Sequence, residues 1–174
     1  MEDWKVERYV SELERQIEYV KLSVKALDET IRSNNVQETF RNLHSFLTHA
    51  ACISKLFWPP EQKSKARAEL LRKLLGVEEE TSPGLSNRSL RNSLDHFDER
   101  LDEAFSKGHG KLFVDSNIGS VGAIDLGPEL VFRNYDPTSR IYTFREQDFD
   151  LGQICKEVGD IERALMAWRT QQAT

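Results

Sequence analysis

Cysteine is scarce in this chain. Only Cys52 and Cys155 occur among 174 residues, and both lie in apolar stretches with helical spacing. Two cysteines cannot supply the disulfide framework that holds many small secreted folds together. We interpret both as buried, reduced thiols, which is typical of a protein in a reducing cytoplasm.

Long hydrophobic runs are also missing. No apolar run in the sequence reaches the roughly 18 residues that a membrane span needs. The first ten residues, MEDWKVERYV, lack the apolar core of a secretory signal peptide. We therefore expect a cytoplasmic protein without membrane association.

The chain has no excess of positive charge, with 24 Lys and Arg against 29 Asp and Glu. A net charge of -5 does not fit a general nucleic-acid binder, which usually carries a basic footprint. The densest basic stretch lies in the first half, and we interpret it as a solvated helix face. It comprises Lys63, Lys65, Arg67, Arg72 and Lys73.

What the sequence does contain is helical periodicity. Apolar residues recur every three or four positions, which predicts amphipathic helices with one buried face. The first stripe extends from Val6 to Ile31, and the second helix from about Gln37 to Phe57. A third helix is expected at about 62–75. The fourth is expected to be capped by Ser86 or Asn87 and to end near Gly108. The fifth is expected at about 149–171, with Asp148 or Asp150 as its cap.

A second pattern interrupts the helices. The segments KLFV, ELVFRN and RIYTFR are short, rich in branched and aromatic residues, and bounded by Gly, Pro and Asp. NYDPTS, between the last two, predicts a hairpin turn. We predict a single, mainly α domain over 1–174, which is an antiparallel bundle of about five helices. A small β-hairpin or sheet is inserted at 111–145, between the fourth and fifth helices. Because the five apolar stripes lie outside the insert, we expect the bundle to fold without it.

Two familiar kinds of site are not supported by the sequence. The glycines in NIGSVGAIDLGPE do not precede a helix, and no Gly-Lys-Ser/Thr follows them, so a phosphate-cradling loop is not predicted. His49 and Cys52 lie one helical turn apart, but no second His/Cys pair completes a zinc site. We predict no metal and no cofactor.

The stretch LRNSLDHFDERL, residues 90–101, contains the candidate functional residues. Histidine titrates near neutral pH and can move protons, and arginine can hold a phosphate through two parallel hydrogen bonds. Asparagine one turn before a histidine can orient its ring. Arg91, Asn92 and His96 therefore form a candidate catalytic set for RNA cleavage, and Arg88 and Arg100 are candidate substrate-binding residues. The alternative is an ordinary charged helix face with internal pairs.

The hexapeptide RNSLDH, within an all-helical context, resembles the signature of HEPN domains. These are small helical bundles of toxin–antitoxin, phage-defence and RNA-processing systems, and many are metal-independent endoribonucleases. The resemblance implies that Arg91 and His96 are the catalytic pair and that Asn92 supports them. It also implies a homodimer with facing motifs, RNA as substrate, and a cognate antitoxin or other protein partner.

The chain departs from the family pattern near the motif. Some toxin members carry a tyrosine two residues after the histidine, where this chain has Asp98. An acidic cluster would repel RNA phosphates near the motif, namely Asp95, Asp98, Glu99, Asp102 and Glu103. A non-catalytic helical interaction or regulatory module, also dimeric, is therefore the second hypothesis.

Overall fold

The computed structural model describes residues 2–89, 92, 96–106, 114–124, 130–145 and 147–172, with the side chains of Phe97, Arg100 and Ala104 left out of that description. The protein is mainly helical and has a small four-stranded sheet. In the described ranges no helix is both long and apolar enough to cross a membrane.

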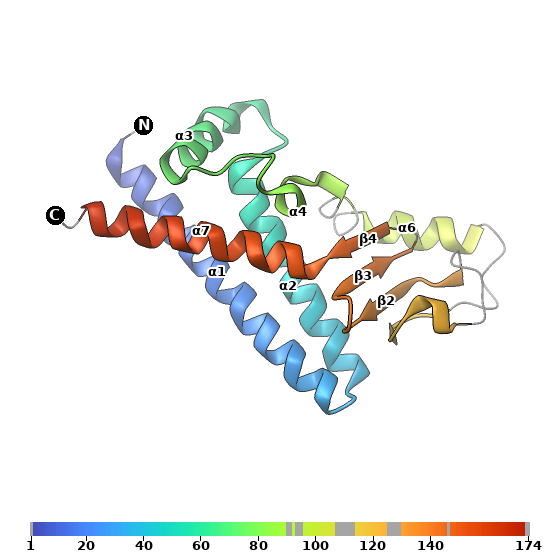
Figure 1. Cartoon of the computed structure of the whole chain (residues 1–174). Coiled ribbons are helices and arrows are strands. Elements are labelled where there is room, and N and C mark those ends of the chain that lie inside the picture. Colours follow the sequence, from blue (N-terminus) through green and yellow to red (C-terminus); the bar gives the residue numbers. More distant parts are fainter. Residues whose placement is uncertain are drawn as a thin grey trace.

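Three long helices form the main body of the molecule (Figure 1). Helix α1 (Asp3–Arg32) and helix α2 (Val36–Phe57) make an antiparallel pair. Helix α7 (Leu151–Gln172) runs across α1 and also packs against α3 (Lys65–Leu75). The two termini therefore lie at the same end of the molecule.

The boundaries of these helices follow the predicted signals. The side chain of Asn35 accepts the backbone N–H of Glu38 at 3.2 Å and caps α2. Gly76 ends α3 in the left-handed conformation, with φ at 61°. The predicted cap of the last helix is confirmed at Asp150, whose carboxylate accepts the N–H of Gln153 at 2.8 Å.

The helix predicted from Ser86 or Asn87 to Gly108 is wrong as one continuous element. A single turn, α4 (Pro83–Ser86), comes first and ends at Asn87. The predicted cap is confirmed at Asn87, whose side chain accepts the N–H of Ser89 at 2.9 Å, and Arg88, Ser89 and Asn92 are helical. Helix α6 (Phe97–Ala104) begins after His96, whose φ of -114° and ψ of 37° are not helical. Apolar spacing does not reveal such a break, because it continues on both sides of it.

The sheet also differs from the prediction in its bounds and in its directions. Its strands are β1 (Asn117–Ile118), β2 (Arg133–Asp136), β3 (Ile141–Phe144) and β4 (Gln147–Asp150), adjacent in that order. Strand β1 pairs parallel to β2, whereas the other two pairs are antiparallel. The sheet therefore extends beyond residue 145 and is not purely antiparallel. The predicted turn between β2 and β3 is confirmed, since Asp136 accepts the N–H of Thr138 at 2.9 Å.

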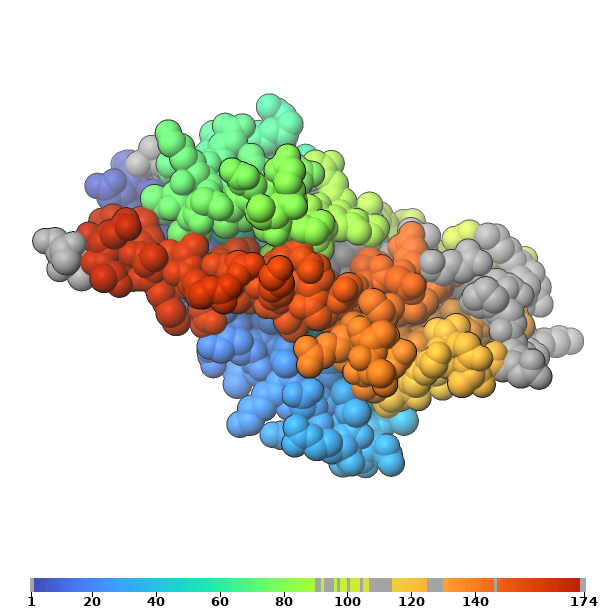
Figure 2. All heavy atoms as spheres, in the orientation of Figure 1, coloured from blue at the N-terminus to red at the C-terminus, as the bar shows by residue number. Residues whose placement is uncertain are grey.

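The sheet is part of the hydrophobic core, which corrects the expectation that the helices bury their stripes without it. Five aromatic residues of this region belong to the same buried cluster as the long helices: Phe132, Tyr135, Tyr142, Phe144 and Phe149. An aromatic side chain buries about 150–250 Å², so these residues contribute substantially to the core. Figure 2 shows α7 (red) lying between the α3–α4 region (green) and the α1–α2 region (blue), with the strands (orange) beyond its first residues.

Candidate functional site

His96 occupies the junction before α6, where its side chain is 53% exposed. Its Nδ1 atom lies 3.1 Å from Oε1 of Glu99, one turn further along the chain. This contact favours the tautomer with the proton on Nδ1. No described residue hydrogen-bonds the other ring nitrogen, Nε2, so it is accessible for proton transfer.

The other predicted site residues are described only in part. Asn92 is exposed, and its backbone carbonyl accepts the N–H of His96 at 3.0 Å, so the two residues lie one turn apart. Arg88 is also exposed. Arg91 and the side chain of Arg100 lie outside the described residues, so the full predicted set cannot be placed together.

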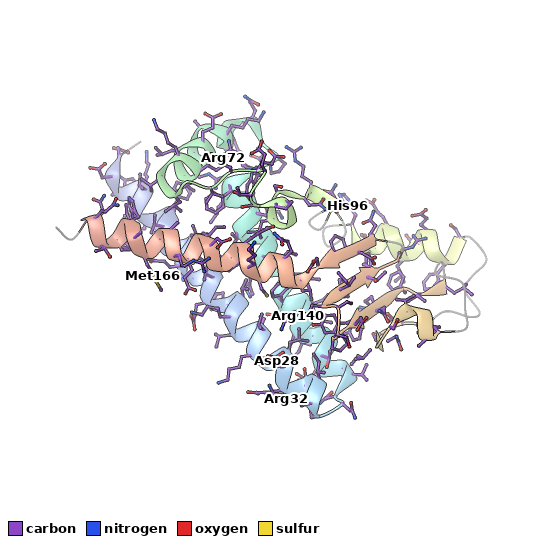
Figure 3. All side chains as sticks on the ribbon, in the orientation of Figure 1. Asp28, Arg32, Arg72, His96, Arg140 and Met166 are labelled. Carbon is purple, nitrogen blue, oxygen red and sulfur yellow. The ribbon has the colours of Figure 1, made fainter. Side chains whose placement is uncertain are left out.

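The carboxylates after the motif are not equivalent. Asp98, Glu99 and Asp102 are exposed on α6. Glu103 pairs with Arg145 through an Nη1–Oε2 distance of 3.0 Å, which joins α6 to the turn after β3. One of the predicted repulsive charges is therefore neutralised, whereas the charge of Glu99 lies beside His96, which Figure 3 labels at the start of α6.

The histidines of α2 have structural surroundings. The Nδ1 atom of His49 lies 2.8 Å from Oε1 of Gln16, and its ring leans against Tyr19 at a centroid distance of 4.8 Å. Burial lowers the pKa of His49. His44 is half-buried, and burial together with the charge of Arg133 lowers its pKa. In the described part of the chain, no group of three or more His, Cys, Asp or Glu side chains could hold a metal ion.

Sequence reasoning missed two polar contacts that organise the structure. Arg133 and Asp115 form a two-pronged ion pair with distances of 2.7 and 2.5 Å. Glu157 is 1% exposed, and its carboxylate accepts the backbone N–H groups of Gly84 and Leu85 at 2.9 and 2.7 Å. No short-range signal could have found either pair, because the partners are far apart in the sequence.

Comparison of the chain with protein-family models, with curated proteins and with solved structures found no match.

Proposed function

We propose that this protein is a metal-independent endoribonuclease of the HEPN type, which cleaves single-stranded RNA in the cytoplasm. The proposal places it in a toxin–antitoxin, phage-defence or RNA-processing system. The observation that carries it is the environment of His96: an exposed imidazole with Nδ1 against Glu99 and with no described residue hydrogen-bonded to Nε2. That arrangement is what a general acid–base histidine requires.

The proposed reaction is attack of the RNA 2′-hydroxyl on the adjacent phosphate. The 2′-oxygen loses its proton and bonds to phosphorus, the bond from phosphorus to the 5′-oxygen breaks, and the leaving oxygen takes up a proton. His96 moves one of these protons, and Glu99 holds its ring. Arg91 stabilises the charge on the phosphate, Asn92 supports the histidine, and Arg88 and Arg100 hold neighbouring phosphates.

A homodimer belongs to the proposal. Two copies related by a two-fold axis near the motif would place Arg91 and His96 of both chains around one phosphate. Such a site would not need both side chains to reach the phosphate from one chain. Light scattering at micromolar concentration should then give twice the chain mass of 20.1 kDa, and a particle of the single-chain mass would contradict this part of the proposal.

The central experiment incubates the purified protein with labelled single-stranded RNA, with and without EDTA. His96→Ala should lower the cleavage rate by a factor on the order of 10²–10⁴. Arg91→Lys should also lose activity, because lysine keeps the charge but lacks the planar fork of donors. EDTA should have no effect, the products should end in a 2′,3′-cyclic phosphate, and DNA should not be cut.

The matched control is His109→Ala, a histidine outside the motif, which should cleave like the original protein. Equal cleavage by the original protein and by His96→Ala would show that the activity comes from a contaminant. Absence of cleavage with several RNAs, by a well-folded dimer, would favour the second function.

The second candidate function is a non-catalytic interaction module, and one surface feature favours it. A groove of about 340 Å³ lies between α1 and α7, with Ile17, Leu165 and Met166 among its lining residues. Met166 is 60% exposed, so its apolar side chain is available to a partner at this groove. Met166→Lys should then abolish capture of a protein partner, an antitoxin in the toxin–antitoxin setting, and neither this variant nor the original protein should cleave RNA.

A further inference from the structure

A small pocket lies where α1, α2, the sheet and the start of α7 meet. Its volume is about 80 Å³. Since a water molecule occupies about 30 Å³ in the liquid, the pocket has room for only a few heavy atoms. Nucleotides and drug-sized ligands need pockets of about 300 Å³ or more, so an occupant here must be much smaller.

The inner wall of the pocket is apolar apart from one hydroxyl group. Leu27, Phe46 and Leu151 line it and are almost fully buried. Tyr135 also lines it and is 5% exposed as a residue, and its hydroxyl has no hydrogen bond to any residue in the described ranges. Its oxygen is not among the buried polar atoms that lack a partner, so this hydroxyl faces water in the pocket and can donate to a ligand there.

The inner groups are uncharged at neutral pH. Burial raises the pKa of the Cys155 thiol to about 11, and burial also raises the pKa of the Tyr135 hydroxyl. The charges of Arg140 and Asp28 act on both groups, which shows that all four residues are close together. Among the described residues that line the pocket, the charged ones are therefore Asp28 and Arg140.

Asp28 and Arg140 carry opposite charges at the mouth of the pocket without pairing. Both side chains are exposed, one on α1 and the other at the turn before β3 (Figure 3). Within the described part of the chain, neither charged group makes an ion pair or a side-chain hydrogen bond, with the other or with a third residue. A ligand can therefore supply both an acceptor for the guanidinium of Arg140 and a donor for the carboxylate of Asp28.

The backbone holds Arg140 in an unfavourable conformation at this place. Its φ is 58°, and the left-handed region costs a non-glycine residue about 1–2 kcal/mol. The carbonyl of Arg140 accepts the N–H of Leu151 at 3.0 Å, which fixes the turn to the start of α7. The backbone of Arg140 is thus fixed relative to the start of α7.

We infer that this pocket binds a small zwitterionic α-amino acid, with its carboxylate on Arg140 and its ammonium on Asp28. A short apolar side chain then packs against Leu27 and Phe46, and the Tyr135 hydroxyl is free to hydrogen-bond the ligand. A simple anion would meet the negative charge of Asp28, and a simple amine would meet the positive charge of Arg140. Only a ligand with both charges matches the two sides of the mouth. The inference is independent of the catalytic role of His96.

Isothermal titration calorimetry with the full chain tests the inference, using L-alanine as the probe. For a ligand of this size we expect saturable binding with a Kd on the order of 0.1–1 mM. Propionate lacks the ammonium and L-alaninamide lacks the carboxylate, so each should bind at least about tenfold more weakly, a difference of 1.4 kcal/mol.

Two charge-neutralising variants and one control complete the experiment. Arg140→Gln and Asp28→Asn should each weaken L-alanine binding at least about tenfold. Both side chains are exposed, so the variants should keep the helical circular dichroism of the original protein. Arg32→Gln is the matched control, because Arg32 is an exposed arginine one turn after Asp28 that does not line the pocket.

Three results would overturn the inference. The first is no saturable binding of L-alanine, L-serine or L-valine up to about 10 mM. The second is binding of propionate or L-alaninamide as tight as that of L-alanine, which would show a plain anion or cation site. The third is an equal loss of affinity in Arg32→Gln, which would show that general surface charge and not the pocket attracts the ligand.

Discussion

The carboxylate of Glu157 accepts the backbone N–H of Leu85 at 2.7 Å, although the two residues are 72 positions apart. The same carboxylate accepts the N–H of Gly84 and a hydrogen bond from the amide of Gln153. On the other side of this turn, the Ser54 hydroxyl donates to the carbonyl of Leu85. Helix α4 is therefore fixed to α7 and to α2 by side-chain hydrogen bonds at both of its ends.

The first prediction concerns this buried carboxylate. Glu157→Gln replaces one carboxylate oxygen, which accepts a hydrogen bond, by an NH₂ group that faces backbone N–H donors. Each hydrogen bond to a charged group contributes about 1.5–3 kcal/mol to stability. We expect the free energy of unfolding in urea to fall by about 2–4 kcal/mol. Asp160→Asn is the control, because Asp160 is an exposed carboxylate on the same helix. This variant should change the free energy of unfolding by less than about 0.5 kcal/mol. Similar values for both variants would contradict the structural role of Glu157.

The second prediction concerns the close packing of α4 on α7. A Cβ atom at Gly84 would lie 2.9 Å from Cγ1 of Ile154 and within 3.2 Å of the Glu157 carboxylate. Gly84→Ala should therefore cost about 1–3 kcal/mol of stability, because the neighbours must shift. The same change at Gly122, where the added Cβ atom would lie 3.6 Å from the Ser120 hydroxyl, should be nearly neutral. Thermal melting of the two variants side by side measures the difference, and equal melting temperatures would count against this packing.

The third prediction tests whether the sheet belongs to the core. Phe149 on β4 is 5% exposed within the common cluster, so Phe149→Ala should destabilise the whole protein by about 3–5 kcal/mol. The helical signal and the aromatic signal in circular dichroism should then be lost in one transition. Met166→Ala removes an exposed apolar side chain and should leave the midpoint almost unchanged. Loss of the aromatic signal alone, with the helices intact, would restore the view of a dispensable insert.

The fourth prediction concerns the pH dependence of Cys155. Because burial raises the pKa of its thiol to about 11, the folded protein should react slowly with a thiol reagent at pH 8. Measured in a Cys52→Ala background, the rate should rise with pH up to about 11, well beyond the range of an ordinary thiol. Unfolded chains ionise this thiol near pH 8.5, so its burial should also lower stability as the pH rises from there toward 11. A rate that levels off near pH 8.5 would contradict the partial burial of this thiol.

The long helices were predictable from the sequence because their signals are local. Apolar spacing identified α1, α2 and α7, and Gly76 and Asp150 gave boundaries that the structure confirms. Such signals depend on residues within one turn of each other, so no tertiary information is needed to read them.

The candidate catalytic motif was also read from the sequence, but its setting was not. The spacing of Arg91, Asn92 and His96 suggested one continuous helix, whereas the backbone leaves the helical conformation at His96. Apolar periodicity continues across such a break, so it cannot reveal one. The contact between His96 and Glu99 depends on the new helix that begins there.

Only the tertiary structure decided which polar residues act together. Nothing near Glu157 in the sequence indicates that it receives the N–H groups of α4, and nothing near Asp28 indicates that Arg140 faces the same pocket. Both relationships join segments that are far apart in the chain. Helical periodicity specifies which face of each helix is buried. Which buried faces contact each other is set by the packing of the whole core. These polar partners come together only when that packing is complete.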